Sequence, residues 1–92
     1  MHPLRVEVHA DRQVSVHGDL VHDSLVKEPT SLAELAPSIT SMDLRGVTHV
    51  DAWGAYCLVQ ARRANPQLRL LNPTPGALRT FEIAGVSDLL FL

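Results

Sequence analysis

Three residues of the types used in nucleophilic catalysis lie in the middle of the chain: His49, Asp51 and Cys57. A cysteine attacks as its thiolate, so it needs a base such as histidine within hydrogen-bond reach and a third group that orients the base. The spacing argues against this arrangement, because His49 belongs to a predicted strand and Cys57 lies inside the helix predicted to follow it. We therefore expect Cys57 to be a small buried or half-buried thiol in a protein that is not an enzyme. A small nucleotide hydrolase is the enzymatic alternative, and no phosphate loop supports it.

Histidines and arginines are the other side chains that could hold a ligand. None of the five histidines has a partner at i, i+4 with a third ligand nearby, so we expect strand or surface histidines and no metal site. Arg62, Arg63 and Arg69 could bind an anion, but no glycine-rich phosphate cradle accompanies them. A solvated cluster is favoured, and no cofactor is expected.

Asp51 follows an apolar run and precedes an amphipathic segment. At that position its side chain can accept hydrogen bonds from the first free N–H groups of a helix, and its charge suits the positive end of the helix dipole. We prefer this N-cap role to a catalytic one, because no base or metal ligand is placed beside Asp51. Gly54, in the first turn, leaves the backbone uncovered and permits close approach of a neighbour or a partner.

The helix predicted over residues 53–64 carries two stripes at helical spacing. The stripe assigned to the core consists of Ala55, Leu58, Val59 and the stem of Arg62. The stripe expected to face outward consists of Trp53, Tyr56, Gln60 and Arg63. Rigid amphipathic rings are favoured anchors at protein interfaces, so this second stripe predicts a partner-binding surface. The alternative is that Trp53 packs sideways onto a neighbouring loop.

The N-terminal half predicts a hairpin, a broken helix and a buried strand. Alternating apolar residues over 4–8 and 14–16 indicate two strands joined by a turn at 10–12, with Gly18 and Asp19 ending the hairpin. Residues 21–36 indicate a helix that Pro29 breaks or delays, with Thr30 or Ser31 as a cap and Glu34 as its capping-box partner. A buried strand is expected over residues 39–44.

The C-terminal third predicts a further strand and helix. Asn65 and Pro66 end the preceding helix, and Leu68, Leu70 and Leu71 mark the strand. The next helix has a cap at Thr74, a proline in its first turn and a stop at Gly85. Its predicted apolar face consists of Ala77, Leu78, Phe81 and Ala84. Residues 89–92 are apolar, and a strand, a helical turn and an uncovered tail all remain open.

This order of elements predicts an α/β fold with an N-terminal β-hairpin followed by alternating strands and helices. The later strands should be parallel in a mixed sheet, with right-handed crossovers and helices mainly on one face. A length of 92 residues suits one domain over 1–92.

Composition excludes several classes of function. The chain is 46% hydrophobic and 20% charged, which suits a compact soluble domain. A net charge of -2, with eight basic residues spread along the chain, disfavours nucleic acid binding. A single cysteine excludes an internal disulfide and fits a reducing compartment. No apolar run approaches the ~20 residues of a membrane helix, and the N-terminus lacks the apolar region of a signal peptide, so we expect a cytoplasmic protein without direct membrane insertion.

The arrangement of strand, Asp51-Ala-Trp-Gly54 and helix resembles the Asp-x-x-Gly turn of the STAS domain, the fold of bacterial anti-sigma-factor antagonists. His17-Gly-Asp-Leu20 resembles the Gly-Glu-Leu corner of that family, and Leu68-Arg-Leu-Leu-Asn72-Pro its next buried strand and loop. Phe81-Glu-Ile-Ala-Gly85-Val-Ser-Asp-Leu-Leu90 resembles its third helix and the Gly-Leu segment that follows. These motifs cover nearly the whole chain in the right order. The resemblance implies a non-catalytic protein that acts by docking onto a protein partner.

The resemblance also implies how this chain departs from the family. In the antagonists the turn usually reads Asp-Ser-Ser-Gly, and a partner kinase phosphorylates the second serine, which expels the partner. Ala52 and Trp53 occupy those places here, so no phosphorylation is expected at the turn. The missing serine and the short C-terminus are more similar to the small STAS subunit of ABC transporters that move phospholipid. Those subunits often carry threonine where this chain has Ala52.

The leading hypothesis is therefore a STAS subunit that binds the ATPase of a phospholipid-transporting ABC system, at the inner face of the inner membrane. The alternative is an antagonist of an anti-sigma or kinase-like protein that is not controlled by phosphate at this turn. A second alternative is a small domain that binds a nucleotide or a lipid. The exposed aromatic pair would also permit a homodimer. The expected partner-binding residues are Asp51, Ala52, Trp53, Gly54, Tyr56, Gln60 and Arg63.

Overall fold

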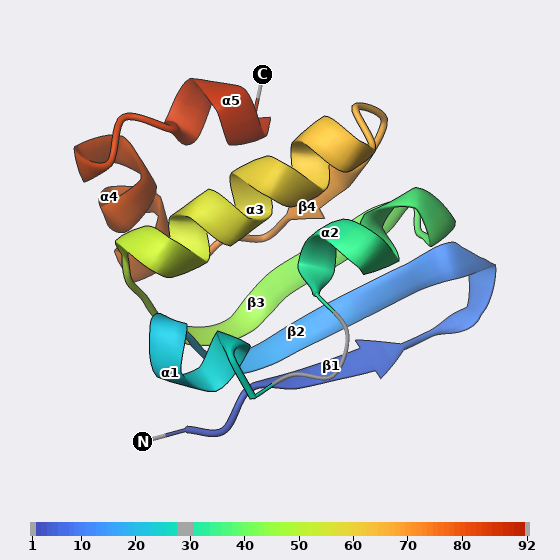
Figure 1. Ribbon diagram of the computed structural model, residues 1–92, viewed down its shortest axis with the longest axis horizontal. Coiled ribbons are helices and arrows are strands. Elements are labelled where there is room, and N and C mark those ends of the chain that lie inside the picture. The colour runs from blue at the N-terminus through green and yellow to red at the C-terminus, as the bar shows by residue number, and fades with distance from the viewer. Residues whose placement is uncertain (1, 28–30, 92) are drawn as a thin grey trace.

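A four-stranded mixed sheet forms one layer of the computed structural model, which describes residues 2–27 and 31–91 (Figure 1). Its strands are β1 (Arg5–Val8), β2 (Gln13–Leu20), β3 (Ser41–Val50) and β4 (Arg69–Leu71), in the spatial order β1-β2-β3-β4. β1 and β2 are antiparallel, and the pairs β2–β3 and β3–β4 are parallel. The predicted hairpin and mixed sheet are therefore confirmed.

The helices form the second layer, on one face of the sheet (Figure 1). They are α1 (His22–Leu25), α2 (Leu32–Leu35), α3 (Ala52–Ala64), α4 (Pro75–Ile83) and α5 (Ser87–Phe91), with short 3-10 turns at Ala10–Arg12 and Ala36–Ser38. α3 lies between α2 on one side and α4 and α5 on the other. This central position makes α3 the element on which the candidate site depends.

The hydrophobic core lies between the sheet and the helices. Its largest fully buried side chains are Val14, Val16, Leu20, Met42, Leu44, Leu58, Leu68, Phe81 and Leu90. The predicted core stripe of α3 is confirmed for Ala55, Leu58 and Val59, and Ala61, which the pattern left out, is buried as well. Burial of a side chain the size of leucine contributes about 1.5–3 kcal/mol, so this interlayer core holds the helices to the sheet.

Two strand boundaries differ from prediction. β2 does not end at Gly18 and Asp19, because Gly18 pairs with Val47 and Asp19 with His49 of β3. The next strand does not cover residues 39–44. It begins at Ser41, after the 3-10 turn whose last hydrogen bond joins the Ile39 N–H to the Ala36 carbonyl, and it continues to Val50.

The helix ends follow local hydrogen-bonding chemistry. The Ser31 hydroxyl accepts from the Glu34 N–H at 3.1 Å, which confirms the late start of α2, whereas Pro29 and Thr30 lie outside the described residues. The Thr74 hydroxyl caps α4 by accepting from the Ala77 N–H at 3.2 Å. Gly85 ends that helix with a φ of 74°, in the left-handed region that suits glycine.

Two residues predicted to be buried are exposed. The conformation of residues 89–91, which the sequence left undecided, is now assigned. The alternation of Leu4, Val6 and Val8 predicted that these side chains point inward, but Val8 is 72% exposed, because it lies at the end of the edge strand β1. Ala84 is exposed, because α4 has ended and the chain turns away at Gly85. Residues 89–91 are helical, and Leu90 is buried in the core while Leu89 stays exposed. Leu92 lies outside the described residues.

Candidate functional site

The Asp51 carboxylate fixes the start of two helices. Its Oδ1 accepts from the Gly54 N–H at 2.8 Å, which confirms the predicted N-cap of α3. Its Oδ2 accepts from the His22 N–H at 3.0 Å, at the first residue of α1. One side chain therefore satisfies free N–H groups of both helices and places a negative charge at both positive ends.

Gly54 lets α3 begin directly against the end of β2. It is buried, and a Cβ built on it would lie 1.9 Å from the Leu20 carbonyl oxygen. A side chain cannot occupy that space unless the backbone moves. The close neighbour that the sequence suggested for Gly54 is thus Leu20 of the same chain.

The first turns of α3 present two aromatic rings on the surface. Trp53 is 46% exposed and Tyr56 is 51% exposed, with ring centroids 6.1 Å apart. The His22 ring meets Trp53 edge-on at 5.1 Å, so the indole also packs sideways, onto α1. The two interpretations made from the sequence are compatible, because one edge of Trp53 is packed while nearly half of its surface stays open.

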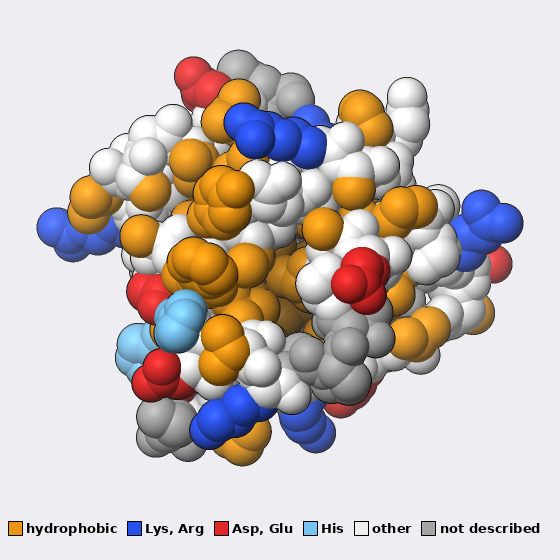
Figure 2. Space-filling view, viewed as in Figure 1, with side chains coloured by type: hydrophobic (Ala, Val, Ile, Leu, Met, Phe, Trp, Pro, Cys, Tyr) orange, Lys and Arg blue, Asp and Glu red, His pale blue; other side chains and the backbone are white. Residues whose placement is uncertain are grey.

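The structure brings most of the seven expected partner-binding residues to one surface. Ala52, Trp53, Tyr56 and Arg63 are exposed, Asp51 and Gln60 are half-buried, and Gly54 is buried. Figure 2 shows hydrophobic side chains gathered around a hollow on this face of the molecule. Binding of a partner by these residues remains a prediction.

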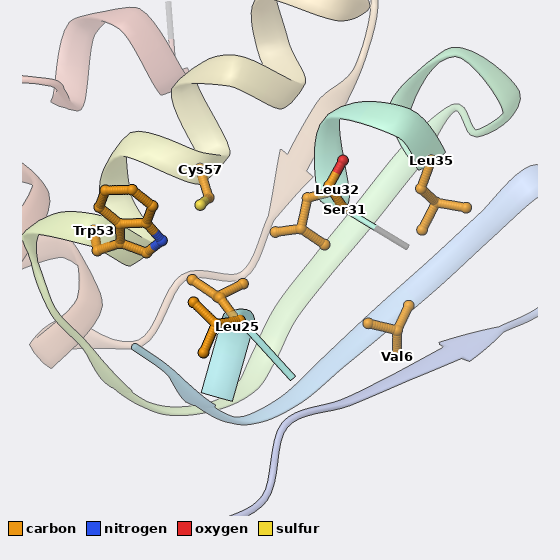
Figure 3. Close-up of a pocket in the computed structure, with 8 residues that line it drawn as sticks. Val6, Leu25, Ser31, Leu32, Leu35, Trp53 and Cys57 are labelled. Carbon is orange, nitrogen blue, oxygen red and sulfur yellow. The ribbon is translucent and has the colours of Figure 1, made fainter. Parts of the chain in front are cut away.

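The hollow is an apolar groove of about 240 Å³ next to Trp53 (Figure 3). Its lining residues are Val6, Leu25, Val26, Ser31, Leu32, Leu35, Trp53 and Cys57. Sequence reasoning missed this groove because its walls come from β1, α1, α2 and α3. The only signal was the group of apolar residues between 25 and 35, which indicated helix.

The possible nucleophile arrangement is not formed. Cys57 is half-buried, as expected, and has no hydrogen-bond partner among the described residues. Burial, with a smaller contribution from the charge of Asp51, raises the pKa of the thiol. His49 directs its Nδ1 at Asp19 Oδ1, at 3.0 Å.

Asp19 is the centre of a polar cluster that the sequence did not reveal. Its carboxylate accepts from the Thr48 hydroxyl at 2.6 Å, from the His49 ring at 3.0 Å and from the His2 N–H at 3.1 Å. These bonds, the one from Thr48 first, hold the pKa of the Asp19 carboxyl well below its usual range. The cluster ties the N-terminal arm to β2 and β3, and the Asp in the Gly-Asp-Leu corner was its only sequence signal.

The remaining candidate groups are the histidines and arginines. Within residues 2–27 and 31–91, no group of three or more His, Cys, Asp or Glu side chains could hold a metal ion. The Arg62 guanidinium donates to the carbonyls of Pro66 and Leu68, so it closes the loop after α3. In the same described part of the chain, no helix is both long and apolar enough to cross a membrane.

The backbone is similar to that of a solved structure, the anti-sigma factor antagonist SpoIIAA in its unphosphorylated form. The TM-score is 0.67, and the match covers 96% of this chain and 85% of that chain. The chain has the STAS fold. The sequence identity is 16%, so the likeness concerns the fold alone. No protein-family model matches the sequence, and a search of curated proteins gives no match.

Proposed function

We propose that this STAS-fold domain acts without catalysis, by docking onto a protein partner through the start of α3. The contact surface consists of Ala52, Trp53 and Tyr56, with Gln60 and Arg63 at its border. The exposed pair of aromatic rings is the observation that carries the proposal. Tryptophan and tyrosine bury a large area at low entropic cost, and they dominate the energetics of many interfaces. Asp51 and Gly54 support this surface from inside, because they hold the first turn of α3 on the sheet.

The partner that we propose is the ATPase of a phospholipid-transporting ABC system. Ala52 and Trp53 offer no hydroxyl group at the turn, which supports a constant association over one that phosphate disrupts. In such a complex the domain would lie at the inner face of the inner membrane and stabilise the ATPase or set its activity. The second candidate is antagonism of an anti-sigma or kinase-like protein, and the likeness to SpoIIAA favours it.

A capture experiment with two matched variants tests the docking surface. Tagged wild-type protein, Trp53→Asp and Ile83→Asp are incubated with native extract, and bound proteins are identified by mass spectrometry. Ile83 is the control, because it is 79% exposed on α4 and lies outside the proposed surface. Circular dichroism establishes that all three proteins are folded.

The wild type and Ile83→Asp should capture the ATPase, and Trp53→Asp should not. Loss of a central aromatic anchor costs about 2 kcal/mol or more, so direct titration with the purified ATPase should show binding at least ~30-fold weaker. Capture of an anti-sigma or kinase-like protein would select the second candidate. Equal capture by wild type and Trp53→Asp would remove the proposed surface.

A further inference from the structure

Short elements form much of the wall of the groove next to Trp53. α1 and α2 have four residues each, and Val6 of β1 lies beneath them as part of the lining. No charged side chain lines the groove among the described residues. Among the described lining residues, the only alcohol group is the Ser31 hydroxyl, which already accepts from the Glu34 N–H. A charged ligand such as a nucleotide would lose its hydration here without compensation, so the groove selects an apolar occupant.

The size of the groove indicates a flexible chain. A cavity of ~150 Å³ admits benzene, which corresponds to roughly 25 Å³ for each carbon. On that scale the groove, at about 240 Å³, holds about ten carbons. The side chain of leucine or phenylalanine has fewer carbons and would leave part of the space empty, against the dense packing of protein interiors. An unbranched aliphatic chain of about ten carbons therefore fills the groove better than either of these two side chains.

The Trp53 indole adds a hydrogen-bond donor at one end of the groove. Its nitrogen faces the groove in Figure 3, and the N–H has no hydrogen-bond partner among the described residues. An indole N–H can only donate, so the matching group is an acceptor. Because Trp53 is nearly half exposed, a charged acceptor at this end would keep its contact with water.

We propose that the groove binds a free medium-chain fatty acid of about ten carbons. The aliphatic chain lies against Val6, Leu25 and Leu32, and the carboxylate stays at the open end and accepts from the Trp53 indole N–H. The groove shares Trp53 with the proposed docking surface, but this site does not rest on the docking function, because it is argued from the lining and volume of the groove and not from a partner.

Fluorescence provides the test, because Trp53 is the only tryptophan of the chain. The full-length protein is titrated with the sodium salts of C6, C8, C10, C12 and C14 fatty acids, below the concentrations at which they form micelles. Emission should change and saturate. Each added CH₂ should tighten binding about fourfold, and the gain should stop near ten carbons, where the groove is full.

Two variants that fill the groove and one control locate the site. Val6→Phe and Cys57→Phe each add a ring to the lining, and decanoate should bind at least about tenfold more weakly to both. Ile83→Phe adds the same ring on the exposed side of α4 and should bind like the wild type. The chain-length series on the wild type stands alone if a filled variant fails to fold.

Several results would overturn the proposal. One is the lack of a saturable signal with any acid. Another is affinity that keeps rising past ten carbons, since that indicates general surface partition. A third is decanoate binding that the filled variants leave unchanged. If no acid binds and Val6→Phe loses the captured protein partner, the groove belongs to the protein interface instead.

Discussion

Replacing Gly54 with alanine tests whether the contact between α3 and β2 is as close as the structure shows. The new Cβ would lie 1.9 Å from the Leu20 carbonyl oxygen and 2.9 Å from the Leu20 carbonyl carbon. Both atoms belong to the backbone of a paired strand, so neither can move aside as the tip of a side chain could. Overpacking of this kind costs about 1–3 kcal/mol, and a rigid backbone obstacle places the cost near the upper end. Alanine regains about 1 kcal/mol of helix propensity, which leaves a net loss of about 2 kcal/mol.

Thermal and urea unfolding followed by circular dichroism measure this loss. For a domain of this size, about 2 kcal/mol lowers the melting temperature by roughly 8–16 °C. Gly76→Ala is the matched control, because Gly76 is also in the first turn of a helix and a Cβ there meets nothing within 4 Å. That variant should be as stable as the wild type, or more stable by up to about 1 kcal/mol. A Gly54→Ala protein that melts at or above the wild-type temperature would refute the reasoning.

Three further predictions follow from the same contacts. Asp51→Ala should lower the free energy of unfolding by about 1–2 kcal/mol, and by more than Thr74→Ala does, because Asp51 accepts from the N–H groups of two helices and Thr74 from one. Urea unfolding of the two variants measures both losses, and equal losses would contradict the capping of two helices by Asp51. Asp19 has a lowered pKa in the folded state, so its contribution to stability is present above about pH 4 and is lost as the pH falls further. The stability difference between wild type and Asp19→Asn should therefore shrink between pH 5 and pH 2, and a constant difference in acid titrations would be the contrary result. Since the pKa of Cys57 is raised, its alkylation by iodoacetamide at pH 8 should be slower than that of free cysteine in a rate assay. An equal or faster rate would contradict the raised pKa and the partial burial of the thiol.

The features that the sequence predicted well are those that depend on neighbours within a few residues. Ser31, Asp51 and Thr74 each cap a helix by accepting from an N–H three residues later, so position and residue type suffice to identify them. Gly85 ends α4 for an equally local reason. The order of these elements was enough to predict the mixed sheet with helices on one face.

The features that were missed depend on residues far apart in the chain. Asp51 and His22 are 29 positions apart, as are Asp19 and Thr48, so neither bond follows from a local pattern. β2 extends past Gly18 only because β3 lies beside it. The groove likewise depends on how β1 and three helices meet, and no periodicity within one segment reports such a space.

The two hydrogen bonds that the Asp51 carboxylate accepts affect how any mutational map of this protein is interpreted. An aspartate at the border of an exposed aromatic pair is an obvious first target for mutagenesis. Yet its loss would release the starts of both α1 and α3, and Trp53 of α3 packs onto α1, against the His22 ring. A variant at Asp51 would weaken partner binding even if the carboxylate never touches the partner, because the indole would lose its fixed orientation. Direct contact with the partner is therefore better tested by substitutions at Trp53 and Tyr56. Variants at Asp51 would instead measure how far partner binding depends on the ordered starts of α1 and α3.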